Sequence, residues 1–203
     1  MRLAVDCSNY TGVIETPALE AIKAFRQGRT AVHHAICGTQ VPSVCDQQLT
    51  TFWNAGFSVD SYVQPGRDSD LRGLALKAKW ACEAFPSFFM PTGRSRAWFA
   101  LEVNPLTDAL AWLESGIRAL KAVGFLRIGI YTRQGAWDNI IGPDGDSLGR
   151  KYPIWYANYD DFAPLTSRIW RLEGFGGWWK PSWKQYAQNI DFGGQPFDLN
   201  QTP

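Results

Sequence analysis

The stretch RAWFALEVNPLTDALAWLESGIRALKAVGFLRIGIYT, residues 96–132, decides the fold class. An apolar run at residues 96–103 predicts a strand. Residues 107–123 carry apolar side chains at helical spacing, and Thr107 is the expected N-cap. A second apolar run at residues 126–132 predicts another strand. This order of strand, helix and strand is typical of a parallel β/α unit with a right-handed crossover.

The same alternation continues on both sides of this unit. Upstream, strands are predicted at residues 2–7, 30–37 and 57–63, and helices at residues 16–26, 45–55 and 68–85. Downstream, the pattern predicts a helix at residues 136–141 and strands at residues 153–159, 168–172 and 184–187. The last two strands have no helix between them. We therefore predict a single parallel, TIM-like β/α barrel over residues 1–203, with about five helices and extra C-terminal strands.

The composition and charge of the chain limit the kinds of molecule that it could bind. Hydrophobic residues make up 45% and charged residues 19% of the chain, which is typical of a folded globular domain. A formal net charge of +1 without a basic stripe argues against nucleic acid as a partner. No run approaches the ~20 apolar residues of a membrane span, and Asp6 interrupts the first apolar run too early for a signal peptide. We expect a monomer with no nucleic-acid and no membrane partner.

The cysteine and histidine patterns do not indicate a metal site. The four cysteines form no C-x-x-C pair, so we expect no metal and no other cofactor. Cys37 and Cys45 could close a short loop by a disulfide, or they could be buried thiols. His33 and His34 lie inside a predicted strand, and we expect one of them to face the barrel interior in a structural role.

Polar residues gather at the ends of the predicted strands, where a β/α barrel carries its active site. Asp6 closes the first strand, Glu102 and Asn104 close the fourth, and Asp198 lies near the C-terminus. On a continuous strand, residues 102 and 104 point to the same side. A carboxylate on an apolar strand is costly unless it is paired or functional, so either a structural ion pair or catalysis would explain Glu102. The 10 Trp, 7 Tyr and 12 Phe could fill a core or line a groove for the flat faces of sugars.

Seven short segments carry a family resemblance. In chain order they are DCSNYTG (6–12), AICGT (35–39), LEVN (101–104), IYT (130–132), PIWYANY (153–159), WKQY (183–186) and FDLN (197–200). Together they resemble glycoside hydrolase family 25, the Chalaropsis-type muramidases, over nearly the whole chain. The resemblance implies an eight-stranded barrel with fewer helices than strands. It also implies cleavage of the β-1,4 bond between N-acetylmuramic acid and N-acetylglucosamine in peptidoglycan, as by a phage endolysin.

One of these segments departs from the family pattern. The family has L-D-x-E where this chain has LEVN, and that Glu is the family's general acid, while the Asp steadies charge or the N-acetyl group. Here Glu102 stands at the Asp position and Asn104 at the acid position. An amide cannot protonate a leaving group at neutral pH. Cys37 also stands where the family often has Glu.

Three interpretations of the site stay open. In the first, which we favour, the chain is an altered muramidase in which Glu102 is the acid and Asp6 or Asp198 stabilises the oxocarbenium-like charge or orients water. In the second, it is a catalytically inactive pseudo-enzyme that still binds the glycan. In the third, it is a docking domain on a phage or secretion particle, with an interface formed by Trp170, Trp178, Trp179 and Trp183.

The resemblance also sets the expected substrate contacts and location. The residues expected to contact the glycan are Asn104, Tyr62, Tyr131, Trp155, Asn158 and Gln185. The expected partner is peptidoglycan or a related N-acetylated glycan. Without a signal peptide, the chain would be phage-encoded or exported by a non-classical route to act on the cell wall, or it would stay in the cytoplasm.

Overall fold

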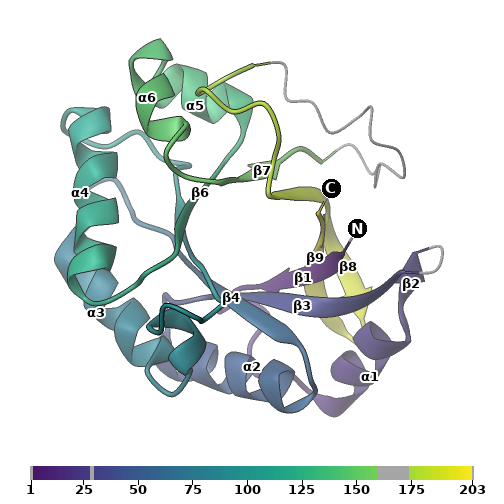
Figure 1. Ribbon diagram of the computed structural model, residues 1–203. Coiled ribbons are helices and arrows are strands. Elements are labelled where there is room, and N and C mark those ends of the chain that lie inside the picture. The colour runs from purple at the N-terminus through teal and green to yellow at the C-terminus, as the bar shows by residue number, and fades with distance from the viewer. Residues whose placement is uncertain (1, 28–29, 160–173, 203) are drawn as a thin grey trace.

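Eight strands close into a barrel around a central axis (Figure 1). The structure, a computed structural model, describes residues 2–27, 30–159 and 174–202. Around the barrel the strands are β1 (Leu3–Cys7), β3 (Thr30–Gly38), β4 (Ser58–Val63), β5 (Ala97–Ala100), β6 (Ile128–Thr132), β7 (Ile154–Ala157), β8 (Trp183–Phe192) and β9 (Gln195–Gln201). The pairs from β1 and β3 through to β8 are parallel. The predicted TIM-like β/α barrel is therefore confirmed.

The helices lie outside the barrel in chain order (Figure 1). They are α1 (Thr16–Ala24), α2 (Pro42–Asn54), α3 (Leu71–Cys82), α4 (Ala109–Ala122), α5 (Gln134–Ile140) and α6 (Asp146–Gly149), with 3₁₀ turns η1 (Pro86–Phe88) and η2 (Pro143–Gly145). The short α6 brings the number of described helices to six, close to the five expected. A two-residue strand, β2 (Arg26–Gln27), pairs with β3 outside the barrel. The strand expected at residues 168–172 lies outside the described residues.

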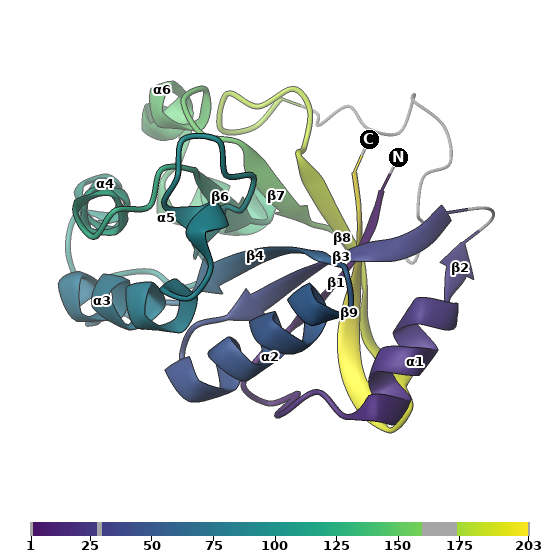
Figure 2. The ribbon, with the colours of Figure 1, turned by 60° about the horizontal axis from the view of Figure 1, so that its bottom comes forward.

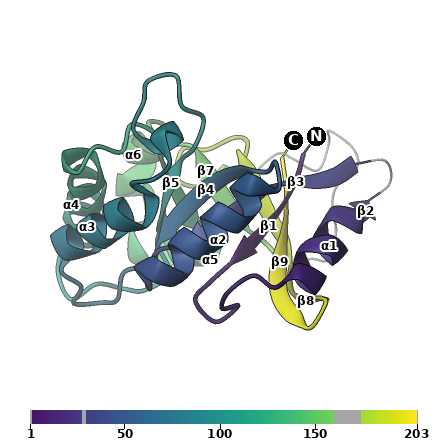
Figure 3. The same cartoon turned by 90° about the horizontal axis from the view of Figure 1, so that it is seen from below.

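The barrel closes through an antiparallel hairpin, because β9 pairs antiparallel with both β8 and β1. Beyond Gln185, β8 pairs only with β9, so the end of the hairpin projects past the end of β7. Figures 2 and 3 show this end beside α1. There Phe192 packs edge-on against Phe25, with ring centroids 5.3 Å apart. The sequence predicted only residues 184–187 as a strand, because polar residues interrupt the apolar pattern after them.

The buried residues form two layers. One lies between the strands and the helices and includes Val5, Phe52 and Leu113. The other fills the barrel itself and contains three indole rings, Trp98, Trp155 and Trp183. Large aromatic side chains occupy a barrel interior efficiently because each buries a large apolar area. Several of the tryptophans therefore hold the barrel together.

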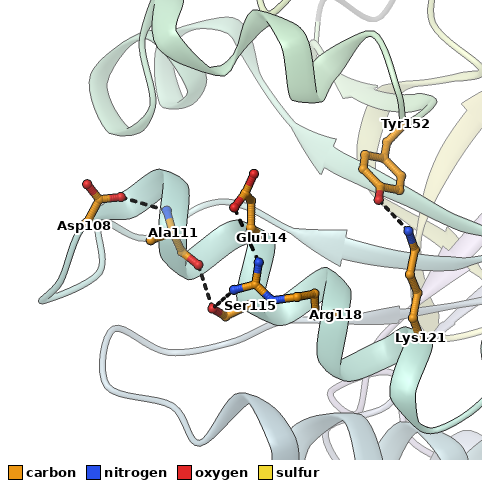
Figure 4. A network of polar contacts seen from close by, with 7 residues as sticks. All are labelled: Asp108, Ala111, Glu114, Ser115, Arg118, Lys121 and Tyr152. Carbon is orange, nitrogen blue, oxygen red and sulfur yellow. Dashed lines mark hydrogen bonds and ion pairs between the residues drawn. The ribbon is translucent and has the colours of Figure 1, made fainter.

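Helix α4 shows how local polar contacts fix an element (Figure 4). The Asp108 carboxylate accepts a hydrogen bond from the Ala111 N–H at 2.7 Å, so Asp108 caps the helix and the expected cap at Thr107 is wrong. At the other end, Lys121 Nζ donates to the Tyr152 hydroxyl at 2.8 Å, ahead of β7. The helix is thereby tied to the segment that leads into β7.

Strand β5 ends earlier than predicted, at Ala100 instead of residue 103. The Leu101 N–H still donates to the Tyr131 carbonyl, at 2.8 Å. The Leu101 carbonyl, however, accepts from the Thr132 hydroxyl at 3.0 Å, so a side chain replaces the next sheet bond. Glu102 and Asn104 therefore lie in a loop, and the expectation that strand geometry points them to the same side is wrong.

All four cysteines are buried, whereas the two histidines differ in exposure. All four cysteines are free thiols in the interior, so Cys37 and Cys45 are not joined. His34 faces the barrel interior against Trp183, whereas His33 is exposed, as expected for one histidine of the pair. Among the described residues, no helix combines the length and apolar character that crossing a membrane requires.

Candidate functional site

A groove opens at the C-terminal ends of the barrel strands, where a β/α barrel places its chemistry. Its central hollow has a volume of about 180 Å³. Seven of the nine predicted site residues line it: Asp6, Tyr62, Glu102, Tyr131, Trp155, Gln185 and Asp198. Gln64 and Tyr159 line it as well. The sequence did contain a signal for Gln64, which follows Tyr62 by two positions at the end of β4 and so belongs to the same strand face.

Asp6 and Asp198 form a carboxylate pair at the base of the groove. They are direct partners across the β1–β9 ladder. Asp6 Oδ2 accepts from Asn200 Nδ2 at 2.6 Å and from Gln185 Nε2 at 3.0 Å. Burial, together with the charge of Asp198, raises the pKa of Asp6 well above its ordinary value, and burial also raises the pKa of Asp198. The pair therefore favours holding a proton, with Asp6, the more buried member, the better place for it.

Gln185 joins this pair to two phenols. Its Nε2 donates to Asp198 Oδ2 at 2.9 Å as well as to Asp6, and its Oε1 accepts from Tyr131 and Tyr159, each at 2.8 Å. The two phenol hydroxyls donate to the amide oxygen, so the amide nitrogen faces the two acids. Burial raises the pKa of Tyr159 to about 12, which keeps its hydroxyl a donor. The four groups thereby fix one orientation of the Gln185 amide.

Glu102 stands on the opposite wall, open to solvent. Its Oε2 accepts from Gln64 Nε2 at 2.7 Å, and Gln64 in turn accepts from Gln40 Nε2 at 3.0 Å. Partial desolvation in the groove raises the pKa of Glu102, against the smaller lowering effects of Gln64 and of the Arg133 charge. In the part of the chain described, no Lys, Arg or His nitrogen lies within 4.0 Å of Glu102. Glu102 is therefore an accessible carboxyl group with a raised pKa, as a general acid requires.

Two predicted contact residues, Asn104 and Asn158, do not line the central hollow. The Asn104 carbonyl accepts from Arg67 Nε at 3.0 Å, which ties the loop after β5 to the loop after β4. The Asn158 N–H donates to the Gln185 carbonyl at 2.9 Å and extends the pairing of β7 with β8. The side chains of both asparagines are at the surface. Their contacts with substrate stay predictions.

The aromatic side chains at the bottom of the groove are held in place by contacts inside the barrel. Trp155 is only 2% exposed, and its Nε1 donates to Asn200 Oδ1 at 2.7 Å. The Tyr131 ring lies 4.5 Å from Trp155 between centroids, and Tyr62 packs on the same indole at 6.0 Å. Trp155 therefore supports Tyr62 and Tyr131, and of these three Tyr62 offers the most surface to a ligand.

A second hollow of about 290 Å³ continues the groove. It shares Asp6, Tyr62 and Asp198 with the first, and Tyr10, which is 90% exposed, lines its side. The hairpin supplies Asn189 on the other side. The two hollows together form a cleft with the Asp6–Asp198 pair between them. Such a shape suits an extended chain of rings on both sides of the acids.

A β-bulge in the β8–β9 hairpin places one backbone N–H donor beside the Asp6–Asp198 pair. The β8–β9 register shifts on either side of Ala187, between Gln185 and Ala187 and between Ala187 and Ile190, and Asn189 adopts φ 55°, in the left-handed region. Its backbone N–H donates to Asp198 Oδ1 at 2.8 Å. Bulges commonly redirect groups near functional sites. Here the bulge supplies Asp198 with a second hydrogen bond, which the sequence did not reveal.

The tryptophans of the docking interpretation do not form one surface. Trp178 is buried against Trp137, with centroids 4.6 Å apart. Trp183 is buried in the barrel beside His34. Trp179 is 77% exposed, and Trp170 lies outside the described residues. The predicted four-tryptophan interface is therefore wrong for at least two of its members.

Comparison with known proteins finds similar sequences among lysozymes. A family model described as lysozyme-like protein 1 matches residues 102–186, less than half of the chain. The chain is 41% identical over 96 residues to probable GH family 25 lysozyme 5 of Dictyostelium discoideum, and 39% identical over 103 residues to probable GH family 25 lysozyme 2 of the same organism. The chain resembles the family 25 lysozymes. The resemblance predicted from the seven segments is thus confirmed.

These alignments cover only part of each protein. They span 44% and 48% of this chain, and 38% and 42% of the two family 25 relatives. The matched part of this chain thus corresponds to about two fifths of each relative's length.

Solved structures share the fold of the whole barrel. The catalytic domain of endolysin ply40 from Listeria monocytogenes bacteriophage P40 has a TM-score of 0.66 at 16% identity, covering 100% of this chain and 93% of that one. The Streptococcus pneumoniae glycosyl hydrolase 25 GHIP has a TM-score of 0.68 at 15% identity, covering 100% and 87%. The modular Cpl-1 endolysin, solved with a peptidoglycan analogue, has a TM-score of 0.58 at 18% identity, covering 98% and 53%. At these identities the likeness establishes the barrel fold.

Proposed function

We propose that this chain is a family 25-type muramidase that hydrolyses the β-1,4 bond between N-acetylmuramic acid and N-acetylglucosamine in peptidoglycan. One observation carries the proposal: three carboxyl groups, Asp6, Glu102 and Asp198, face one open groove at the C-terminal end of the barrel. Glycoside hydrolysis needs a proton donor on one side of the bond and a carboxylate on the other. The lysozymes and endolysins among the compared proteins support the same substrate class.

Glu102 is the proposed proton donor. Its raised pKa favours the protonated form, its carboxyl group is open to solvent, and Gln64 fixes its position. A carboxyl group of this kind can give its proton to the glycosidic oxygen as the bond breaks. Its longer side chain, compared with the Asp that the family has at this position, extends the reach of the acid into the groove.

The Asp6–Asp198 pair is the proposed stabiliser of positive charge. Asp198 is the less buried member and lines both hollows, so we assign it the negative charge that faces the oxocarbenium-like transition state. The oriented Gln185 amide, which donates to both Asp6 and Asp198, holds Asp198 in place. The Asn189 N–H completes the hydrogen bonding of its second oxygen.

The test is release of reducing ends from purified peptidoglycan by the wild type and by Glu102→Gln. The amide keeps the hydrogen-bonding shape of the side chain but cannot donate the proton, so activity is expected to fall about 10²–10⁴-fold. The matched control is Glu83→Gln, the same change at an exposed residue that follows α3. The control should keep full activity. Equal rates in the wild type and in Glu102→Gln would contradict the assignment.

A second candidate function, glycan binding without cleavage, rests on Asn104. The chain has an amide where the family has its acid, and the Asn104 side chain is at the surface instead of in the central hollow. Under this alternative the wild type binds chitooligosaccharide but releases no reducing ends above the Glu102→Gln background. Asn104→Glu would then create activity if the rest of the site matches the family. If glycan neither binds nor is cut, both candidates fail.

We further propose that the protein acts as a monomer on the bacterial cell wall. The substrate is an extended, insoluble polymer, and an open cleft lets the barrel approach a strand from the side. The three carboxyl groups of the proposed chemistry, Asp6, Glu102 and Asp198, come from one chain and line one hollow. Sedimentation of the active protein at one protomer's mass would support this, and activity confined to a dimer would oppose it.

A further inference from the structure

A third hollow lies at the opposite end of the barrel from the muramidase groove. Its volume is about 350 Å³. Arg2 precedes β1, Ser58 opens β4 and Ser95 precedes β5, so three of its lining residues mark the N-terminal ends of parallel strands. The proposed glycan chemistry uses none of these residues.

The charge around this hollow is positive. Arg2 and Arg94 line it and are exposed, and within the described ranges neither guanidinium has a carboxylate within 4.0 Å. None of its lining residues is acidic. The hollow therefore presents two unpaired guanidinium groups, which suit a carboxylate as a charge-assisted partner.

A buried polar group also belongs to its wall. His34 is 8% exposed, and its Nε2 has no hydrogen-bond partner, lying 3.4 Å from Asp60 Oδ2. Asp60 is already engaged, because Oδ2 accepts from Trp98 Nε1 at 3.0 Å and Oδ1 from the Arg96 N–H at 2.8 Å. The Nε2 atom is closed off from solvent, so its contact with Asp60 fixes the wall of the hollow and leaves ligand contacts to the other lining residues.

The remaining lining has the features of a sugar site. Trp53, on α2, is 47% exposed and offers part of an indole face, which Phe85 holds edge-on at 6.1 Å. Ser58 and Thr92 present exposed hydroxyls, and the Ser87 and Ser95 hydroxyls bond each other at 2.7 Å. Hydroxyls that can donate and accept match ring hydroxyls, and an aromatic face matches ring C–H groups. The volume fits one six-membered ring better than a chain.

We propose that this end of the barrel is a binding site for a carboxylate-bearing pyranose. The carboxylate lies between Arg2 and Arg94, the ring lies on Trp53, and the serine and threonine hydroxyls receive the ring hydroxyls. The site is separate from the groove and does not depend on whether the groove cuts glycan.

The test is an NMR titration of the intact chain with glucuronate and, as a matched neutral probe, glucose. Glucuronate is expected to shift the Trp53 indole N–H signal and to bind at least tenfold more tightly than glucose. Arg94→Gln should weaken glucuronate binding at least tenfold, while Arg72→Gln, the same change on the exposed face of α3, should leave it unchanged.

Three results would overturn the proposal. Equal binding of glucose and glucuronate would remove the role of the guanidinium groups. Inorganic phosphate that binds as tightly as glucuronate and shifts the same signals would show a simple anion site without recognition of the ring. Glucuronate shifts confined to the groove, lost in Glu102→Gln but kept in Arg94→Gln, would place the ligand at the other end. Loss of peptidoglycan cleavage alone bears only on the muramidase proposal.

Discussion

At the residue scale, the protonation of Glu102 depends on one neighbouring amide. The Gln64 N–H stabilises the ionised carboxylate and so opposes the rise in its pKa. Gln64→Leu removes that bond, so the pKa of Glu102 rises further and the acid stays protonated to higher pH. The alkaline limb of the pH profile of kcat/KM should therefore move upward. A limb that stays in place or moves downward would contradict the role of Glu102 as the acid.

The buried Asp6 makes stability depend on pH in a defined direction. Its folded-state pKa is raised, so its contribution to stability is fully present below the unfolded-state pKa of about 3.9. That contribution is lost as pH rises through the folded-state pKa. Asp6→Asn should flatten the fall in melting temperature between acid and neutral pH, because the amide oxygen still accepts from Asn200 and Gln185. Asp138→Asn, at an exposed position of α5, is the control and should follow the wild type at each pH.

At the element scale, the bulge of β8 requires a left-handed residue at position 189. Asn189→Gly keeps the backbone donor to Asp198 and removes the conformational cost, so stability and activity should be close to wild type. Asn189→Val forces a β-branched residue into that conformation and should lower the free energy of unfolding by about 1–2 kcal/mol. Urea denaturation of both variants checks this. A valine variant as stable as the glycine variant would show that the bulge rearranges freely.

Helix α4 packs on β5 through a glycine. A Cβ at Gly116 would lie 2.2 Å from the Phe99 ring, so Gly116→Ala overpacks the layer and should cost about 1–3 kcal/mol. Gly135, in α5, has nothing within 4 Å of such a Cβ, so Gly135→Ala should stabilise by about 0.4–1 kcal/mol. Chemical denaturation midpoints should therefore move in opposite directions. Two shifts of the same sign would contradict the packing described here.

The individual strands and helices also show which parts of the fold the sequence could predict and which it could not. Alternating apolar runs and helical spacing predicted the parallel strands and most helices, because each depends on local pattern. The predicted end of β5 was wrong because the observed end depends on Thr132, which lies 31 positions from the Leu101 carbonyl that it bonds. The Asp6–Asp198 pair could be suspected at strand ends, but its link through Gln185 depends on the closure of β9 onto β1. Such long-range pairings leave no local pattern in the sequence.

At the scale of the whole molecule, the barrel has two chemically different ends. The C-terminal end gathers three carboxyl groups around a cleft, and the N-terminal end presents arginines around a separate hollow. The interior between them is filled by Trp98, Trp155 and Trp183, with His34 and Asp60 toward the basic end. The family resemblance predicted the acidic end through its motifs. No sequence motif predicted the arginine-lined hollow at the N-terminal end. Several of its residues come from the starts of strands, which lie together only in the folded barrel.

The most direct test of the central claim is a structure of Glu102→Gln with a peptidoglycan tetrasaccharide. The sugar chain should occupy both hollows of the groove, with the side chain at position 102 about 2.6–3.2 Å from a glycosidic oxygen and Asp198 on the other side of that bond. A tetrasaccharide bound with Asn104 as the nearest side chain to the glycosidic oxygen, or bound away from the groove, would contradict the account.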